Sequence, residues 1–195
     1  MSKIKTEAWV KAGYKILGEE GIEGIKVERL ARTLELNKSG FYHYFGSMNN
    51  FLQELLCYHV SEAKLISQEI SECANLDPDL LLLIIRRKAF FLVESQFLIR
   101  CKPSQFGSQL DEASKIVNKE ILPLWRTATQ LPEDITAALA YLNIIHHFFY
   151  ATIDSDKMNY MSLHSLAIQT NDVLNKVVAG KHVVMKGSPP DSDST

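Results

Sequence analysis

The chain has 195 residues, of which 46% are hydrophobic and 23% charged, and its formal charge at pH 7 is −2. This composition is typical of a globular protein and excludes a collagen-like, disordered or membrane-embedded chain, and the length suffices for one large domain or two small ones. Three widely spaced cysteines without a C-x-x-C pair, Cys57, Cys73 and Cys101, indicate buried free thiols rather than a disulfide framework or a zinc site.

The N-terminus lacks the apolar core of a signal peptide. The longest apolar region, Leu80 to Ile99, is interrupted by three basic residues and by Glu94, so it is not a transmembrane span. We therefore expect a soluble, cytoplasmic protein that does not enter a membrane.

An amphipathic helix is predicted from Lys3 to Glu20. Its apolar side chains recur every four residues, at Ile4, Ala8, Ala12 and Ile16. Gly21 follows as a typical C-terminal cap. This helix is expected to pack across the next two and to complete a small three-helix core.

Residues 26–45 are predicted to form two short helices joined by a tight turn. The apolar positions of the first helix share one face: Val27, Leu30, Ala31 and Leu34. Asn37 is a good N-cap for the second helix, which runs from Lys38 to Phe45. This arrangement is that of a helix-turn-helix.

The second helix has one apolar edge and one polar face. Wound at about 100° per residue, Phe41 and Phe45 fall together and must face the core. Ser39, Gly40 and His43 lie on the opposite face, and Tyr42 and Tyr44 flank the phenylalanine edge. Small and polar residues that face outward from a short helix suit the major groove of DNA.

The pattern is similar to the DNA-binding domain of the tetracycline-repressor (TetR) family of bacterial transcriptional regulators. The resemblance covers residues 3–63 and rests on these positions: Gly21, Leu30-Ala31, Leu36, Tyr42-x-Tyr44-Phe45 and Leu52. It implies a DNA-binding domain over residues 1–47. Its base contacts would come from Ser39, Gly40 and His43, and its phosphate contacts from Lys26, Lys38, Tyr42 and Tyr44.

Three positions depart from the family pattern. Lys26 stands where Ser or Thr usually caps a helix, and Lys26 has no side chain suited to capping. Glu35 stands where Gly usually forms the turn, and a left-handed backbone there would cost a non-Gly residue about 1 kcal/mol. Met48 replaces a usual Lys, which removes one basic contact.

The N-terminal region is also only weakly basic, because residues 1–60 carry 8 basic against 7 acidic residues.

The rest of the chain is predicted to be helical, giving an all-α fold with a larger ligand-binding and dimerisation domain over residues 48–186. Ser47 would cap a long helix over residues 48–70 that belongs to both domains, and a turn follows at residues 75–78. Further helices are predicted over residues 79–101, 107–130 (one or two helices, broken or kinked at Pro123), 133–153 and 162–179. The tail, residues 187–195, is too polar to fold.

A pocket for a small, largely apolar molecule is predicted in the second domain. Its candidate lining residues are aromatic or polar: Phe90, Phe91, Trp125, His146, Phe148, Phe149 and Tyr150. His146 and His147 are adjacent and point about 100° apart on a helix, so they do not form a metal site. We find no nucleophile–base, metal or phosphate-loop motif, so the sequence indicates neither an enzyme nor a cofactor.

The functional prediction is a homodimeric repressor that binds a palindromic operator in double-stranded DNA and is released by an unknown small-molecule effector. Dimerisation is predicted through the helices over residues 133–153 and 162–179, because the first is apolar on nearly all sides. The alternative is a helical interaction module whose helix-turn-helix no longer binds DNA, which the weak basic bias and Met48 keep open.

Overall fold

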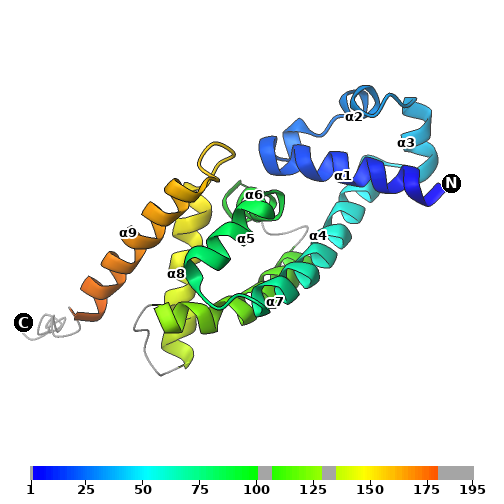
Figure 1. Ribbon diagram of the computed structural model, residues 1–195. Coiled ribbons are helices and arrows are strands. Elements are labelled where there is room, and N and C mark those ends of the chain that lie inside the picture. The colour runs from blue at the N-terminus through cyan, green and yellow to red at the C-terminus, as the bar shows by residue number, and fades with distance from the viewer. Residues whose placement is uncertain (1, 101–106, 129–134, 180–195) are drawn as a thin grey trace, which may run out of the picture.

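The computed structural model describes residues 2–100, 107–128 and 135–179, and every regular element in these ranges is helical (Figure 1). The helices are α1 (Ser2–Glu20), α2 (Val27–Thr33), α3 (Lys38–Phe45), α4 (Met48–Ser71), α5 (Leu81–Arg86), α6 (Lys88–Ser95), α7 (Gly107–Ala128), α8 (Ile135–Thr152) and α9 (Tyr160–Ala179). The predicted all-α fold is confirmed. Among the described residues, none of the helices combines the length and apolar character needed to cross a bilayer.

The N-terminal helices form a small aromatic core. The side chains of Trp9, Phe41 and Phe51 are fully buried, and the ring of Phe41 lies 5.6 Å from Trp9 and 5.0 Å from Phe51 between centroids. Phe45 closes the cluster at 4.8 Å from Phe51. Because Phe41 and Phe45 belong to α3 and Phe51 to α4, this packing fixes the orientation of α3 on the body of the domain.

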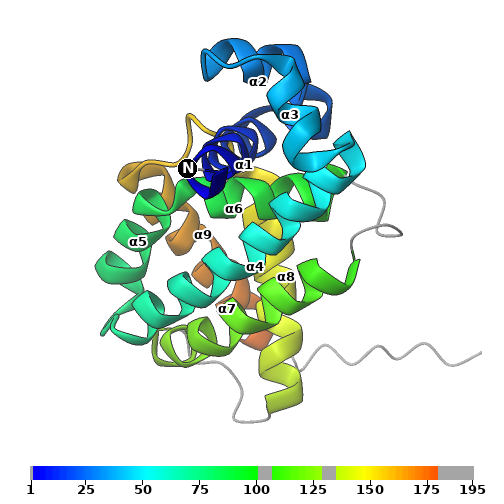
Figure 2. The ribbon, with the colours of Figure 1, turned by 90° about the vertical axis from the view of Figure 1, so that its right-hand side faces the viewer.

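Helix α4 belongs to both domains, as predicted from its unbroken periodicity (Figure 2). The Ser47 hydroxyl accepts a hydrogen bond from the Asn50 N–H at 3.2 Å and caps the helix. Leu55 lies in the N-terminal core, whereas Ile66 and Ile70 lie in the core of the second domain. The first turns of α4 therefore pack in the first core, beyond the predicted boundary between residues 47 and 48.

The predicted single helix over residues 79–101 is interrupted. Arg87 adopts φ −103° and ψ 24° and separates α5 from α6, although neither Gly nor Pro stands there. The Arg87 guanidinium pairs with Glu69 and Glu62 of α4. Helix α5 packs on α9 and helix α6 packs on α1, so the two segments must run in different directions. Tertiary contacts therefore break a helix that local propensity favours.

Helix α7 is continuous through Pro123, so one helix fills the region where one or two were predicted. Proline removes a backbone hydrogen bond to the preceding turn. The buried stripe of Ala113, Val117 and Ile121 holds the helix against the core. Cys57, predicted to be buried, is exposed on α4, and Cys73 is half-buried. Cys101, the predicted helix end at residues 102–104 and the tail 187–195 lie outside the described residues.

Candidate DNA-binding surface and ligand cavity

Helix α3 exposes the residues that the sequence assigns to DNA. Lys38, Ser39, Tyr42 and His43 are exposed, and Tyr44 is half-buried between His43 and Phe45. A Cβ added at Gly40 would meet no atom closer than the Tyr44 Cε2 at 4.0 Å. The outer face of α3 is therefore open at its centre, where a DNA groove could approach the backbone.

The turn between α2 and α3 is tight. Glu35 has a positive φ of 54°, so the left-handed conformation inferred from the family pattern is present without glycine. The Leu36 N–H donates to the Ala31 carbonyl at 2.9 Å and closes the turn. Asn37 occupies the N-cap position, but its side chain makes no capping hydrogen bond, contrary to the prediction. Its carbonyl instead accepts the Gly40 N–H at 2.9 Å.

Two basic residues lie at the edges of this surface. The Lys38 ammonium is 2.8 Å from the Glu28 carboxylate, and both side chains are exposed. Lys26 is exposed at the N-cap of α2, without a side-chain capping bond. An exposed ion pair contributes only about 0–1 kcal/mol, so the pair with Glu28 holds Lys38 only weakly.

Residues 10–55 match the family described as bacterial regulatory proteins, tetR family. The N-terminal domain is that of a TetR-family transcriptional regulator. The match spans the second half of α1, all of α2 and α3, and the first turns of α4, and it includes Phe41, Phe45 and Phe51 of the aromatic core. The chain is thus a DNA-binding transcriptional regulator. No curated protein and no solved structure matches the chain.

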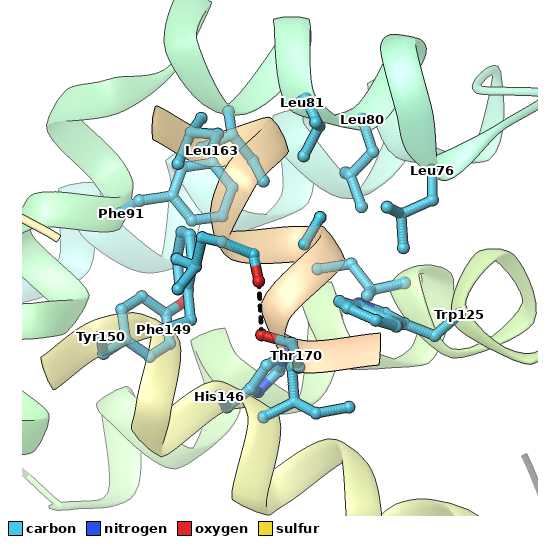
Figure 3. A pocket seen from close by; sticks show the side chains of 15 residues that line it. Leu76, Leu80, Leu81, Phe91, Trp125, His146, Phe149, Tyr150, Leu163 and Thr170 are labelled. Atoms are coloured by element: carbon cyan, nitrogen blue, oxygen red, sulfur yellow. Dashed lines mark hydrogen bonds between the residues drawn. The ribbon is translucent and has the colours of Figure 1, made fainter. Parts of the chain in front are cut away.

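The second domain holds a cavity of about 50 Å³. Its lining comes from the turn before α5 and from α5 to α9, and the labelled residues converge on it in Figure 3. The residues that line it are Leu76, Leu80, Leu81, Ile84, Phe91, Ile121, Trp125, Ile145, His146, Phe149, Tyr150, Leu163, Leu166, Ala167 and Thr170. Ligand pockets commonly measure about 300–1,000 Å³. An occupant larger than a few waters must therefore displace the lining.

Five of the seven predicted pocket residues line this cavity: Phe91, Trp125, His146, Phe149 and Tyr150. Phe90 does not line it, because its ring points to the other side of α6 and stacks on His59 at 4.5 Å. Phe148 does not line it either, because it lies on the outer face of α8 and is 48% exposed. Helical spacing places an aromatic on a helix but does not say which neighbour that face meets.

The polar groups of the cavity are few and neutral. Burial, with a smaller contribution from His147, lowers the pKa of His146 to about 4, so its imidazole is uncharged at pH 7. The Thr170 hydroxyl donates to the Leu166 carbonyl at 2.7 Å (Figure 3). Burial raises the pKa of Tyr150 well above its ordinary value. The cavity therefore suits an apolar occupant with a neutral hydrogen-bonding group.

The pKa of His146 is about 4 in the folded chain and about 6.5 in the unfolded chain. As the pH falls, the unfolded chain therefore takes up this proton at a higher pH than the folded chain does. We expect the free energy of unfolding to decrease as pH falls from about 6.5 to about 4. His146→Gln should reduce this loss, which chemical denaturation at several pH values would measure. His147→Gln on the exposed side of α8 is the control, and an equal effect of both variants would contradict the assignment.

A buried chain of polar side chains joins the two domains, and the sequence analysis missed it. The Tyr14 hydroxyl lies 2.6 Å from His59 Nδ1, and His59 Nε2 lies 3.2 Å from the Glu94 carboxylate. The Ser114 hydroxyl donates to the same carboxylate at 3.2 Å. His59 and Glu94 have side-chain exposures of 0% and 1%. The sequence signal that could have revealed it is a single polar residue, His59 or Glu94, within each of two otherwise apolar helical stretches.

Burial is the main cause that raises the pKa of Tyr14 well above its ordinary value, so the phenol keeps its proton and can donate it to His59 Nδ1. In the His59 tautomer that accepts this bond, the proton sits on Nε2 and faces the Glu94 carboxylate. We call Tyr14, His59, Glu94 and Ser114 the buried polar chain. It links α1, α4, α6 and α7.

Proposed function

We propose that the chain is a homodimeric repressor that binds a palindromic operator through α3 and is released by a small, uncharged effector held in the cavity. One observation supports this proposal above the others. A TetR-type domain with an exposed α3 face packs, through α4, against a second domain that holds an apolar cavity. A dimer of such domains would place its two α3 helices in major grooves roughly 34–36 Å apart.

The dimer is proposed to form through an apolar surface on α8 and α9, which lie side by side (Figure 1). The exposed residues that define this α8–α9 apolar face are Ile144, Phe148, Met161, Ile168 and Val173, with exposures of 64%, 48%, 74%, 50% and 59%. Large apolar side chains that are this exposed mark an interaction surface. A second copy would cover them in a four-helix arrangement around a two-fold axis.

The route from the cavity to the DNA-binding domain is proposed to run through α6. No α4 residue lines the cavity, so a ligand bound there would not press directly on α4. Helix α6 instead presents Phe91 to the cavity and the neighbouring Phe90 to His59 of α4. Glu94, one helical turn after Phe90, lies within hydrogen-bond distance of the same histidine. A ligand that shifts Phe91 therefore moves the contacts of His59.

Helix α6 is also tied to both neighbouring structures. The Ser95 hydroxyl donates to the Tyr150 carbonyl of α8 at 2.7 Å, beside the cavity. The Gln96 side chain donates to the Gly18 carbonyl of α1 at 3.2 Å. A Cβ added at Gly18 would lie 3.3 Å from the Ala89 carbonyl, so α1 and α6 pack closely there. These contacts support transmission of an α6 shift to the DNA-binding helices as a rigid body.

DNA binding is tested with the DNA upstream of the chain's own coding region and with mixed duplex. We expect log K to fall by about 0.9 per neutralised phosphate with log salt. Tyr42→Phe should weaken binding to all sequences about equally, whereas His43→Ala should change the sequence preference. Fluorescence anisotropy over a salt series measures both effects. Absence of binding to any duplex at low salt would contradict the proposal and favour the interaction module.

Effector control is tested by finding a stabilising ligand by thermal shift and then titrating the operator with and without it. The coupling between such sites is typically about 1–3 kcal/mol and reciprocal, so operator DNA must weaken ligand binding by the same factor. Trp125→Ala should weaken ligand binding, because Trp125 lines the cavity. Leu82→Ala, on the exposed side of α5, is the control. A ligand that leaves operator affinity unchanged is not the effector.

A further inference from the structure

A second hollow, separate from the cavity, opens where α1, α4 and the junction of α5 with α6 meet. Its volume is about 240 Å³. The charged residues that line it are Lys11, Lys15, Glu62, Arg86, Arg87 and Lys88, and we call this hollow the basic groove. It draws one wall from the DNA-binding domain and the other from the second domain.

The basic groove carries an excess of positive charge that its own ion pairs do not cancel. Lys11 pairs with Glu7 at 2.6 Å, and Arg86 and Arg87 share Glu69. With Glu62, three carboxylates face five basic groups, which leaves two positive charges on a chain whose net charge is −2. A local excess of positive charge in a hollow raises the local concentration of anions.

The two uncompensated charges belong to Lys15 of α1 and Lys88 of α6. Both side chains are exposed, and neither forms an ion pair with any residue in the described ranges. Both line the same groove, so a single anion between them would satisfy each. Such an anion would bridge the DNA-binding domain and the second domain.

The floor of the basic groove is aromatic. Tyr14, Tyr58 and Phe90 line it, and the rings of Tyr14 and Tyr58 meet edge to face at 4.9 Å. Burial, followed by the negative charge of Glu62 and a side-chain hydrogen bond with Glu62, raises the pKa of Tyr58 to about 12, so its hydroxyl stays protonated. Tyr14 and Phe90 both contact His59, so the floor rests on the buried polar chain.

We propose that the basic groove is a second ligand site, which binds a small aromatic anion such as an aryl phosphate or aryl carboxylate. The anionic group lies between Lys15 and Lys88, and the ring packs against the half-buried Tyr58. This site differs from the cavity in chemistry, because the cavity is neutral and apolar while the groove is cationic and open. The proposal does not depend on the identity of the cavity effector.

The probe is phenyl phosphate, titrated into the full-length chain at constant ionic strength and followed by amide NMR. We expect saturable shifts of the Lys15, Lys88 and Ala89 amides. The double variant Lys15→Gln/Lys88→Gln should bind about tenfold more weakly, since it removes both exposed charges that would pair with the anion. Lys119→Gln, an exposed lysine of α7 outside the groove, should bind as the unsubstituted chain does.

Inorganic phosphate, which lacks a ring, should bind to the same amides more weakly than phenyl phosphate. Equal affinity of phenyl phosphate for the double variant and for Lys119→Gln would overturn the proposal, as would shifts that do not saturate. Circular dichroism confirms that each variant folds. Because operator binding and cavity binding are measured with other probes, failure of this site leaves the proposed repressor function intact.

Discussion

Replacing His59 with leucine is expected to destabilise the chain by about 3–5 kcal/mol, because it leaves the buried Tyr14 hydroxyl without a partner and the buried Glu94 carboxylate with Ser114 as its remaining donor. The Tyr14 hydroxyl and the Glu94 carboxylate both lose their contact with the imidazole, and neither is reached by solvent. Phe90 also loses the ring on which it stacks. Since α4 is shared, both domains should be affected.

The two tryptophans of the chain allow each domain to be followed separately. Trp9 is buried in the N-terminal core, and Trp125 packs against the core of the second domain. Trp9→Phe costs no hydrogen bond, because the Trp9 indole N–H has no partner among the described residues. In single-tryptophan backgrounds, urea unfolding of the His59→Leu variant should show a lower midpoint at both reporters. A change at one reporter alone would contradict an energetic link through His59.

A double-mutant cycle isolates the buried polar chain from the loss of packing. Tyr14→Phe alone should cost about 1–3 kcal/mol, because it leaves His59 Nδ1 unpaired. In the His59→Leu background the same substitution should cost little or even stabilise, because the orphaned hydroxyl is removed with it. Additive effects of the two substitutions would mean that the 2.6 Å contact contributes no coupling energy.

Charging the α8–α9 apolar face should dissociate the proposed dimer and abolish tight binding to the proposed operator. In Ile144→Asp/Phe148→Asp, two carboxylates one helical turn apart would have to enter the interface of each subunit. A monomer loses the second half-site, whose effective concentration is worth about 10²–10⁴ in affinity. We therefore expect operator affinity to fall by at least about a hundredfold while α3 itself is unchanged.

Light scattering measures the dissociation of the dimer, and fluorescence anisotropy measures the loss of operator affinity. Point variants are preferable to truncation at residue 132, because α8 and α9 also supply buried core residues such as Leu142 and Leu163. Leu82→Asp is the matched control, since Leu82 is 49% exposed on α5 and lies outside the face. A monomeric unsubstituted chain at micromolar concentration, or a variant that remains dimeric, would remove the dimer proposal.

Much of the N-terminal domain could be predicted from the sequence because its signals are local. The inward face of Phe41 and Phe45, the cap by Ser47 and the strained turn at Glu35 follow from spacing and backbone preference within a few residues. The outward position of Ser39 and His43 follows from the same winding. The cap by Asn37 failed, because its side chain makes no bond while its carbonyl accepts the Gly40 N–H.

The sequence by itself determined that the chain is all-helical, where α1, α3 and α4 lie, and that α3 turns Ser39 and His43 outward. Only the tertiary structure decided the break at Arg87, the neighbours of Phe90 and Phe148, and the buried polar chain through His59. The physical reason is the separation along the chain between residues that contact each other. Periodicity reports which residues share a helix face, whereas the partner of that face lies 35 residues away for His59 and Glu94 and 45 for Tyr14 and His59. Such a partner is set by how the helices pack.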